Sequence, residues 1–523
     1  MKSSLLLNHL FLAPRRILFV AGLFFFLPLF LFAQKQPSFV TDSLDKYIIR
    51  EISTQQIPGL AIAIVKDGKV VMSKGYGVTE TGKTQTVNDS TLFQIASCSK
   101  AFTATSLALL DQQHKLSLDD TVLKWMPGFK LYDDYTTHHV TIRDLLCHRI
   151  GLQTFQGDFV NWNSNLTRQE IIARMAIEKP VFGFRAKFGY CNAAFLTAGE
   201  IIPIVTGQSW DAFVKATFFD PLQMTRTSTT HAVISTDKNA CKSHTIYQGK
   251  LISFNQDKVD NLGPAGSINS CVKDLSHWML MQLDSGRYNG KEIVPFSVLK
   301  ETRMPQTLID SPSNAATHFT TYCLGWFSYD YYGKQVFYHT GGTDGFLSVV
   351  CVIPELNLGI TILVNSDHCS LYNDLRKQII DAYMNLPYKN YALVSDNRSN
   401  TYAMRESAGL KELQDSAAMK ISLPVAIENF KGMYYNPVYG KMMISTDDGK
   451  LAATFEHHPA MFGKLEYIGN NRLLCTFNSS MWGIDIFPFV IKDGKVESIT
   501  VNVNPNVDMM PYVFTKRAAF SPQ

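Results

Sequence analysis

Hydrophobic residues follow strand-like spacing at both ends of the stretch between residues 38 and 386. Gly59 to Lys66 and Lys69 to Gly75 are two such runs, and the Asp67-Gly68 pair between them is typical of a two-residue hairpin turn. Three further strand-like runs come much later, at residues 335–339, 346–353 and 358–365. Because helical spacing separates the two groups, we expect an α+β domain whose antiparallel sheet is closed by both ends of the stretch.

The most apolar helical stretch of this domain runs from about Ser97 to Gln113. It has no charged residue between Ala101 and Leu110, which predicts a helix buried in the core. Apolar residues also recur with helical spacing at 193–205 and 274–283. We therefore expect helices to flank the sheet.

The pattern changes after about residue 386. Residues 387–425 are polar with one helical patch, Tyr402 to Met419, and we interpret them as a linker. From 426 to 517, short strand-like runs alternate with turns such as Asp448-Gly449 and Asp493-Gly494. This spacing predicts a separate small all-β domain, either a barrel or a sandwich.

The first 33 residues have the pattern of an export signal. Arg15 and Arg16 precede an uncharged run at 17–33, and polar residues follow it. The run is slightly shorter than the roughly 20 residues of a membrane span. We expect an exported protein, periplasmic or secreted, with the alternative that residues 17–33 stay uncleaved as a membrane anchor.

Charge and cysteine content exclude several classes of protein. The 523 residues carry 49 Lys and Arg against 45 Asp and Glu, a formal charge of +4, whereas nucleic-acid binders cluster basic residues. The 9 cysteines lie far apart and form no Cys-x-x-Cys pair, and the pairs His138-His139 and His457-His458 lack a metal-binding frame. We expect no nucleic-acid partner, no metal and no organic cofactor.

The candidate chemistry lies in Ser97-Cys98-Ser99-Lys100. A serine and a lysine at positions i and i+3 of a helix share one face, so the amine can reach the hydroxyl. Burial disfavours an ammonium and can lower the pKa of a lysine by up to about 3–5 units. A neutral Lys100 amine can then accept a proton from Ser97, which otherwise is a weak nucleophile.

The spacing alone is weak evidence, because the chain holds 5 Ser-x-x-Lys matches. The others begin at Ser43, Ser235, Ser270 and Ser297. Ser97 differs because the ten residues after Lys100 are uncharged, whereas Ser43 and Ser297 precede charged amphipathic stretches. The context therefore favours Ser97 as the reactive serine.

A Ser-Lys pair also needs a second proton carrier and a site for the oxyanion. Tyr190 and Asn192 would supply a phenol and an amide on one side of an extended segment. His339-Thr340-Gly341-Gly342 ends a strand-like run, and its glycines allow close approach of a ligand to backbone N–H groups.

Six segments around these residues form a recognisable series. In chain order they are PGLAIAIVKDGKVV (58–71), FQIASCSKAFTA (93–104), TIRDLLCHRIGL (141–152), FGYCNAAF (188–195), GPAGSINSCVKDLSHWM (263–279) and YHTGGTDGF (338–346). Over about residues 40–385 the series resembles the serine β-lactamase and penicillin-binding-protein superfamily, in the branch of class C β-lactamases, D-Ala-D-Ala peptidases, D-aminopeptidases and related esterases. The resemblance implies a β-lactamase/transpeptidase-like sheet flanked by helices, a helical subdomain, and an appended small β domain.

The resemblance also implies roles for the site residues. Ser97 would be the acylated nucleophile, Lys100 its base and Tyr190 the residue that exchanges protons with the leaving group. Asn192 would bind the substrate amide together with the segment His339, Thr340 and Gly341, and the N–H groups of Ser97 and Gly342 would form the oxyanion hole. His339 stands where strict β-lactamases have lysine, which favours peptidase or esterase activity.

Sequence reasoning thus predicts an exported serine hydrolase that acts on amides or esters through an acyl-enzyme. The substrate is a small molecule or a peptide: a β-lactam, a D-amino-acid peptide such as a peptidoglycan fragment, or a small ester. Two alternatives stay open, a D-Ala-D-Ala carboxypeptidase and a penicillin-binding or sensing protein that does not turn over. The sequence does not determine the oligomeric state.

Overall fold

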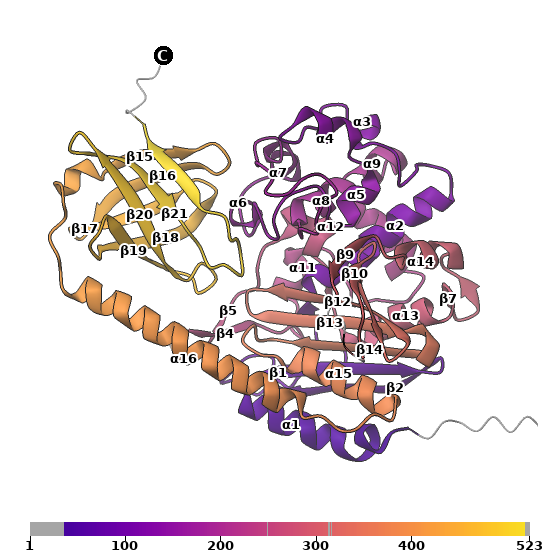
Figure 1. Cartoon of the computed structure of the whole chain (residues 1–523). Coiled ribbons are helices and arrows are strands. Elements are labelled where there is room, and N and C mark those ends of the chain that lie inside the picture. Colours follow the sequence, from indigo (N-terminus) through magenta and orange to yellow (C-terminus); the bar gives the residue numbers. More distant parts are fainter. Residues whose placement is uncertain (1–35, 248, 312–313, 315, 518–523) are drawn as a thin grey trace, which may run out of the picture.

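The structure is a computed structural model that describes residues 36–517, apart from 248, 312, 313 and 315. The expected export signal, residues 1–33, lies outside the described residues. A sheet covered by helices forms the first domain, a barrel forms the second, and one long helix joins them (Figure 1). In the described part of the chain, no helix is both long and apolar enough to span a bilayer.

The central sheet is antiparallel and, within the described residues, has eight strands in the order β2-β1-β14-β13-β12-β11-β10-β9. Their bounds are β1 (Gly59–Lys66), β2 (Lys69–Gly77), β9 (Thr307–Asp310), β10 (Thr320–Tyr322), β11 (Phe327–Tyr331), β12 (Lys334–Thr343), β13 (Phe346–Ile353) and β14 (Leu358–Val364). β1 pairs with β14, Leu60 lying opposite Val364. The sheet is therefore closed by both ends of the domain, as the pattern predicts.

Two features of the sheet differ from the sequence-based expectation. The run expected at 335–339 continues to Thr343, so the segment His339 to Gly342 lies within β12. β9, β10 and β11 extend the sheet beyond the expected strands. They have only 3 to 5 residues each, which is too short for a period-two pattern to stand out.

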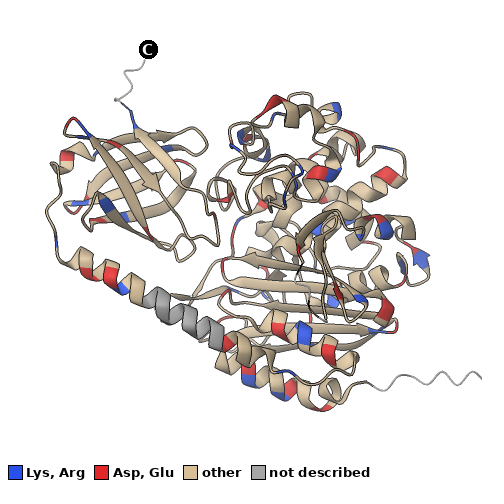
Figure 2. Ribbon diagram, in the orientation of Figure 1, with Lys and Arg blue, Asp and Glu red and all other residues tan. Residues whose placement is uncertain are grey.

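Strand β1 is buried on both faces, because helices cover both sides of the sheet. Leu60, Ile62 and Ile64 pack into one hydrophobic core, and the alternate residues Ala61 and Ala63 pack into the other. Helices α1 (Leu44–Thr54) and α15 (Leu371–Tyr383) belong to the first core, and α2 (Lys100–Gln112) and α13 (Val272–Leu283) to the second. Charged residues lie mostly on the outer helices and loops (Figure 2).

The remaining elements of the first domain are short. The helices are α3 (Val122–Trp125), α4 (Asp134–His139), α5 (Ile142–Leu146), α6 (Asp158–Asn161), α7 (Arg168–Arg174), α8 (Asn192–Gly199), α9 (Ile201–Thr206), α10 (Trp210–Val214), α11 (His231–Thr236), α12 (Gly263–Gly266) and α14 (Phe296–Thr302). Three strand pairs are β3 (Phe93–Gln94) with β6 (Asn269–Ser270), β4 (Ser243–Tyr247) with β5 (Lys250–Phe254), and β7 (Arg287–Tyr288) with β8 (Lys291–Glu292). Most of the short helices gather above the sheet as a helical subdomain (Figure 1).

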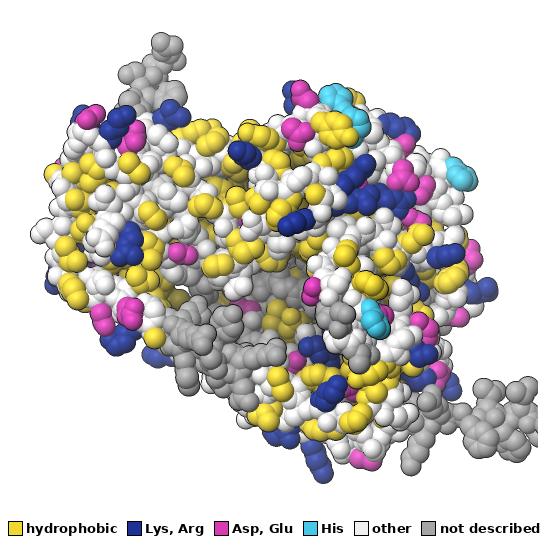
Figure 3. Space-filling view, viewed as in Figure 1, with side chains coloured by type: hydrophobic (Ala, Val, Ile, Leu, Met, Phe, Trp, Pro, Cys, Tyr) yellow, Lys and Arg dark blue, Asp and Glu magenta, His cyan; other side chains and the backbone are white. Residues whose placement is uncertain are grey.

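The second domain is a closed antiparallel barrel, which decides between the barrel and the sandwich that the sequence left open. Its strands are β15 (Gly432–Asn436), β16 (Gly440–Asp447), β17 (Lys450–Phe455), β18 (His458–Tyr467), β19 (Arg472–Phe477), β20 (Ile484–Lys492), β21 (Lys495–Val501) and β22 (Tyr512–Lys516). Both signs of charge are interspersed over the face in Figure 3.

The linker holds a longer helix than the sequence predicts. α16 spans Tyr391–Ala418, whereas the helical patch was expected only from Tyr402. It runs from the side of α15 to the barrel (Figure 1). The barrel also contacts α6 of the first domain directly, because Phe159 packs against Tyr439 and Trp482 of the barrel.

Truncation of β1 tests the two-sided burial of this strand. Ile62 is fully buried, and Ile62→Ala is expected to lower the free energy of unfolding by about 2–5 kcal/mol, because it leaves a cavity in the core. Val70 on the neighbouring β2 is 41% exposed, and Val70→Ala is expected to change it by less than about 0.5 kcal/mol. Denaturant unfolding followed by tryptophan fluorescence measures both, and equal effects would contradict the described burial.

Candidate active site

Ser97 lies in a short 3₁₀ turn, Ala96–Ser99, that leads directly into α2. Ala96 has a φ of 46°, a left-handed conformation that non-glycine residues seldom adopt. Strained backbone of this kind is frequent next to reactive groups. The turn leaves the Ser97 hydroxyl half-buried at the wall of a cavity of about 620 Å³.

The Lys100 amine is fully buried one turn further along the chain. Its Nζ donates to the Ser97 Oγ at 3.2 Å, to the Asn192 Oδ1 at 2.6 Å and to the backbone carbonyl of Ala265 at 2.8 Å. These three acceptors hold the amine against the hydroxyl. The lysines of the other four Ser-x-x-Lys matches, 46, 238, 273 and 300, are all exposed.

Burial lowers the pKa of Lys100 to about 7. A large fraction of the molecules therefore carries a neutral amine at neutral pH. Only the neutral amine can accept the proton of Ser97, so the lowered pKa of Lys100 is the condition that the predicted proton transfer needs.

Tyr190 places its ring 4.6 Å from the Lys100 amine. The hydroxyl is buried and lies within reach of the Ser97 side chain, and burial raises the pKa of Tyr190 well above its usual range. The phenol therefore keeps its proton at neutral pH. His148 supports this segment, because its ring lies 4.2 Å from that of Tyr190 and its Nδ1 accepts the N–H of Cys191.

Asn192, the first residue of α8, has a defined amide orientation. Its Oδ1 faces Lys100, and its Nδ2 donates to the Asp158 Oδ2 at 2.7 Å. Asp158 itself is buried at the start of α6, and burial raises the pKa of its carboxyl well above the usual range. No sequence signal indicates Asp158, since it approaches Asn192 only through the fold.

His339 lies in the wall of the cavity with both ring nitrogens engaged by the protein. Its Nδ1 is 2.6 Å from the carbonyl oxygen of Thr340, to which it donates, and its Nε2 accepts from the Tyr322 hydroxyl at 3.0 Å. Burial lowers the pKa of His339 to about 3. The ring is thus neutral and offers a substrate carboxylate neither a charge nor a free N–H.

The glycines of β12 have different positions. Thr340 and Gly342 line the cavity together with Ser97, whereas Gly341 does not. A Cβ on Gly341 would lie 2.1 Å from the carbonyl oxygen of Ile95, next to the turn that carries Ser97. Gly341 therefore lets β12 pack directly against that turn.

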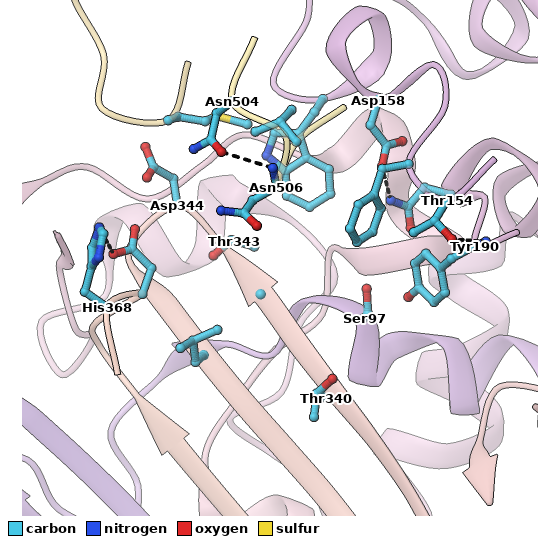
Figure 4. A pocket seen from close by; sticks show the side chains of 18 of the residues that line it. Ser97, Thr154, Asp158, Tyr190, Thr340, Thr343, Asp344, His368, Asn504 and Asn506 are labelled. Atoms are coloured by element: carbon cyan, nitrogen blue, oxygen red, sulfur yellow. Dashed lines mark hydrogen bonds and ion pairs between the residues drawn. The ribbon is translucent and has the colours of Figure 1, made fainter. Parts of the chain in front are cut away.

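The far wall of the cavity comes mostly from segments outside the recognisable series, and Asp344 is the member that belongs to it (Figure 4). It includes Asp344, Asp367 and His368 of the first domain and Met481, Asn504 and Asn506 of the barrel. Among the described residues that line the cavity, none is a lysine or an arginine. Burial, together with the nearby carboxyls of Asp257 and Asp367, raises the pKa of Asp344 above its usual range.

The site thus combines a hydroxyl, a neutral amine and a phenol, which suits nucleophilic catalysis with proton transfer. Within the described residues, no group of three His, Cys, Asp or Glu side chains is arranged to hold a metal ion.

The chain matches one protein family and is similar to several known proteins. A family model described as Beta-lactamase matches residues 44–383. Protein flp of Staphylococcus aureus (strain N315) is 29% identical over 365 residues, which cover 67% of this chain and 68% of that protein. Unguisins hydrolase ungD of Aspergillus violaceofuscus is 25% identical over 451 residues, 78% of each chain.

Two solved structures share the fold. The octameric penicillin-binding protein homologue of Pyrococcus abyssi has a TM-score of 0.59 at 20% identity and covers 90% of this chain and 99% of its own. The D-stereospecific amidohydrolase of a Streptomyces species has a TM-score of 0.51 at 23% identity and covers 64% and 98%. These likenesses concern the fold, and the wide coverage by the first one includes the barrel region.

Replacement of Gly341 tests the packing behind Ser97. Gly341→Ala is expected to lower the free energy of unfolding by about 1–3 kcal/mol, because its Cβ would overlap the rigid backbone at Ile95. Gly128→Ala is the control, since a Cβ there meets no atom within 4 Å. Thermal unfolding measures both, and a Gly341→Ala variant as stable as the control would contradict the close contact.

Proposed function

The chain belongs to the β-lactamase family of serine hydrolases, and we propose that it is an exported enzyme that cleaves an amide or ester through an acyl-enzyme on Ser97. The observation that carries this proposal is the buried amine of Lys100, 3.2 Å from the Ser97 hydroxyl. The pattern of residues 1–33 supports export.

In the first step, neutral Lys100 accepts the proton of Ser97 while the serine oxygen attacks the substrate carbonyl carbon. The carbonyl oxygen becomes an oxyanion, and the backbone N–H groups of Ser97 and Gly342 are the proposed donors to it. Both residues line the same cavity, which supports this assignment.

In the second step, the carbon–nitrogen or carbon–oxygen bond of the leaving group breaks. The leaving group takes a proton from the Tyr190 phenol, which regains one from the Lys100 ammonium. Water then attacks the carbonyl carbon of the ester to Ser97 and loses a proton to the same pair. The bond from that carbon to the Ser97 oxygen breaks, the pair returns the proton to this oxygen, and the acid product leaves. The 4.6 Å between the Lys100 amine and the Tyr190 ring supports this exchange.

The charge of the cavity favours a neutral or cationic substrate over one bound through a carboxylate. The described lining has no lysine or arginine, and His339 is neutral with both ring nitrogens engaged. Asp344 would ionise beside a cationic group, because a nearby positive charge lowers a carboxyl pKa. We therefore place esters and peptide amides ahead of β-lactams and of D-Ala-D-Ala carboxypeptidase substrates, both of which carry a free carboxylate.

The name of one similar protein, a D-stereospecific amidohydrolase, supports an amide substrate with a D-configured centre. The name of another, a hydrolase of unguisins, supports hydrolysis. We propose a peptide or amide that contains a D-residue as the first substrate class to assay, with small esters as the second.

A panel of esters, D-residue peptide amides and β-lactams tests the assignment. Ser97→Ala and Lys100→Ala are expected to lower kcat/KM on the cleaved substrates by about 10²-fold or more, because they remove the nucleophile and its base. Ser235→Ala is the matched control, since it changes an exposed serine of the same Ser-x-x-Lys spacing.

Mass spectrometry of the intact protein separates the alternatives. A transient adduct on Ser97 indicates turnover, a lasting adduct with penicillin indicates a non-turning-over sensor, and release of D-alanine from a pentapeptide indicates a carboxypeptidase. Full activity in both Ser97→Ala and Lys100→Ala would exclude the proposed site.

The pH dependence tests the role of the amine. The active form of Lys100 is neutral, so kcat/KM on an uncharged ester is expected to fall about tenfold per pH unit below about 7 and to level off above it. Burial lowers the pKa of His339 to about 3 and raises that of Tyr190, so neither group accounts for a fall in kcat/KM just below pH 7. Stopped-flow assays between pH 5 and 9 measure the profile, and a flat profile would contradict a lysine base.

A further inference from the structure

We propose that the barrel forms part of the catalytic apparatus, with Asp508 of the barrel and Asp158 of α6 as positioning residues for Asn192 and Lys100. The inference rests on the proposed function, because it concerns the reactivity of Ser97. It assigns the second domain a role in the chemistry as well as in lining the cavity.

The barrel holds the short helix α6 in place. Phe159 is fully buried, and barrel rings surround it, with centroid distances of 4.8 Å to Tyr439, 5.3 Å to Tyr512 and 5.4 Å to Trp482. α6 has only 4 residues, too few to be stable as an isolated helix. Its position therefore depends on these barrel contacts.

Asp508 of the barrel also forms hydrogen bonds to the backbone of α6 and of the residue before it. The Asp508 Oδ2 accepts the backbone N–H of Gly157 at 3.0 Å and that of Phe159 at 3.3 Å. The Tyr512 hydroxyl donates to the same oxygen at 2.6 Å. Asp508 thus fixes the backbone on both sides of Asp158.

Asp158 of α6 is connected to the Lys100 amine through the side chain of Asn192. The Asp158 Oδ2 accepts the Asn192 Nδ2, and this contact makes the Asn192 Oδ1 face Lys100. Without it the amide can turn over and point its NH₂ at the Lys100 Nζ, which would place two donors opposite each other whenever Lys100 is an ammonium. Lys100 would then lose its 2.6 Å acceptor and its fixed position beside Ser97.

The contact from Asp158 to Asn192 is a hydrogen bond that requires an acceptor oxygen at this position. Asp158 and Glu178 are both buried, and burial raises the pKa of each well above its usual range. Burial also raises the pKa of Asp508, to about 6. An asparagine at 158 retains an oxygen acceptor for Asn192, so it is the conservative replacement.

A small fluorophosphonate tests the proposal, because it reacts with Ser97 and does not need to bind the wall of the cavity that the barrel forms. The Ser97 oxygen bonds to phosphorus and displaces fluoride, so the labelling rate reports the reactivity of Ser97. Asp508→Ala and Asp158→Ala are expected to slow labelling of the full-length protein by about 10- to 100-fold, because small displacements of catalytic groups cost this much. Asp158→Asn is expected to recover the rate to within about threefold of the wild type.

Asn165→Ala is the matched control. It removes a side-chain contact to the barrel at His457, 3.0 Å away, but leaves α6 untouched, and its labelling rate is expected to equal that of the wild type. Circular dichroism and thermal unfolding verify that each variant is folded. If Asp508→Ala does not fold, the comparison of Asp158→Ala with Asp158→Asn decides the question.

The outcomes separate this inference from the proposed function. Wild-type rates in folded Asp508→Ala and Asp158→Ala would overturn the positioning role while Ser97 remains the nucleophile. Equal losses in Asp158→Ala and Asp158→Asn would also overturn it, because charge rather than geometry would then matter. A wild-type protein that is not labelled at Ser97 would overturn the proposed function itself.

Discussion

A primary amine removed from water is costly to keep protonated, and the active site is built around one such amine. Lys100 is fully buried, which lowers its pKa to about 7. Between that value and about 10.5 the unfolded chain carries a proton on this group that the folded chain lacks, so Lys100 makes stability rise with pH over this window. The three acceptors around Nζ hold the amine in place beside the hydroxyl.

The rest of the first domain fixes where this amine meets the hydroxyl. The turn at Ser97 lies against β12, which approaches closely because residue 341 has no side chain. β12 in turn lies in the middle of a sheet buried between two cores. The rigid sheet on one side and α2 on the other therefore hold the nucleophile, and the left-handed conformation of Ala96 persists because this surrounding structure determines it.

The sequence predicted contacts between residues close together in the chain better than contacts made by the packing of distant segments. Ser97 and Lys100 are one helical turn apart, so their proximity and the uncharged helix that buries Lys100 could be derived from adjacent residues. The hairpin at Asp67-Gly68 was predictable for the same reason, whereas the pairing of the two ends of the sheet followed from the order of strand-like and helical runs along the chain. Asp158 and Asp508 are 350 positions apart and meet through domain packing, for which a single sequence carries no signal. His339 was visible as a residue type, but its pairing with Tyr322 was not, and that pairing decides what the ring can bind.

The two-domain construction of the cavity separates reactivity from recognition. Ser97, Lys100 and Tyr190 all belong to the first domain, whereas Met481, Asn504 and Asn506 of the barrel lie on the opposite wall. Changes in those barrel side chains alter the shape of the cavity without contact to the amine. Changes in Asp508 or Phe159 act on α6 instead, and through Asp158 they reach the amide that orients Lys100. The same domain thus contacts the site by two routes, and because only one of them passes through α6, a change in Met481, which lies outside the loop of Asp508, can alter substrate preference while the nucleophile stays activated.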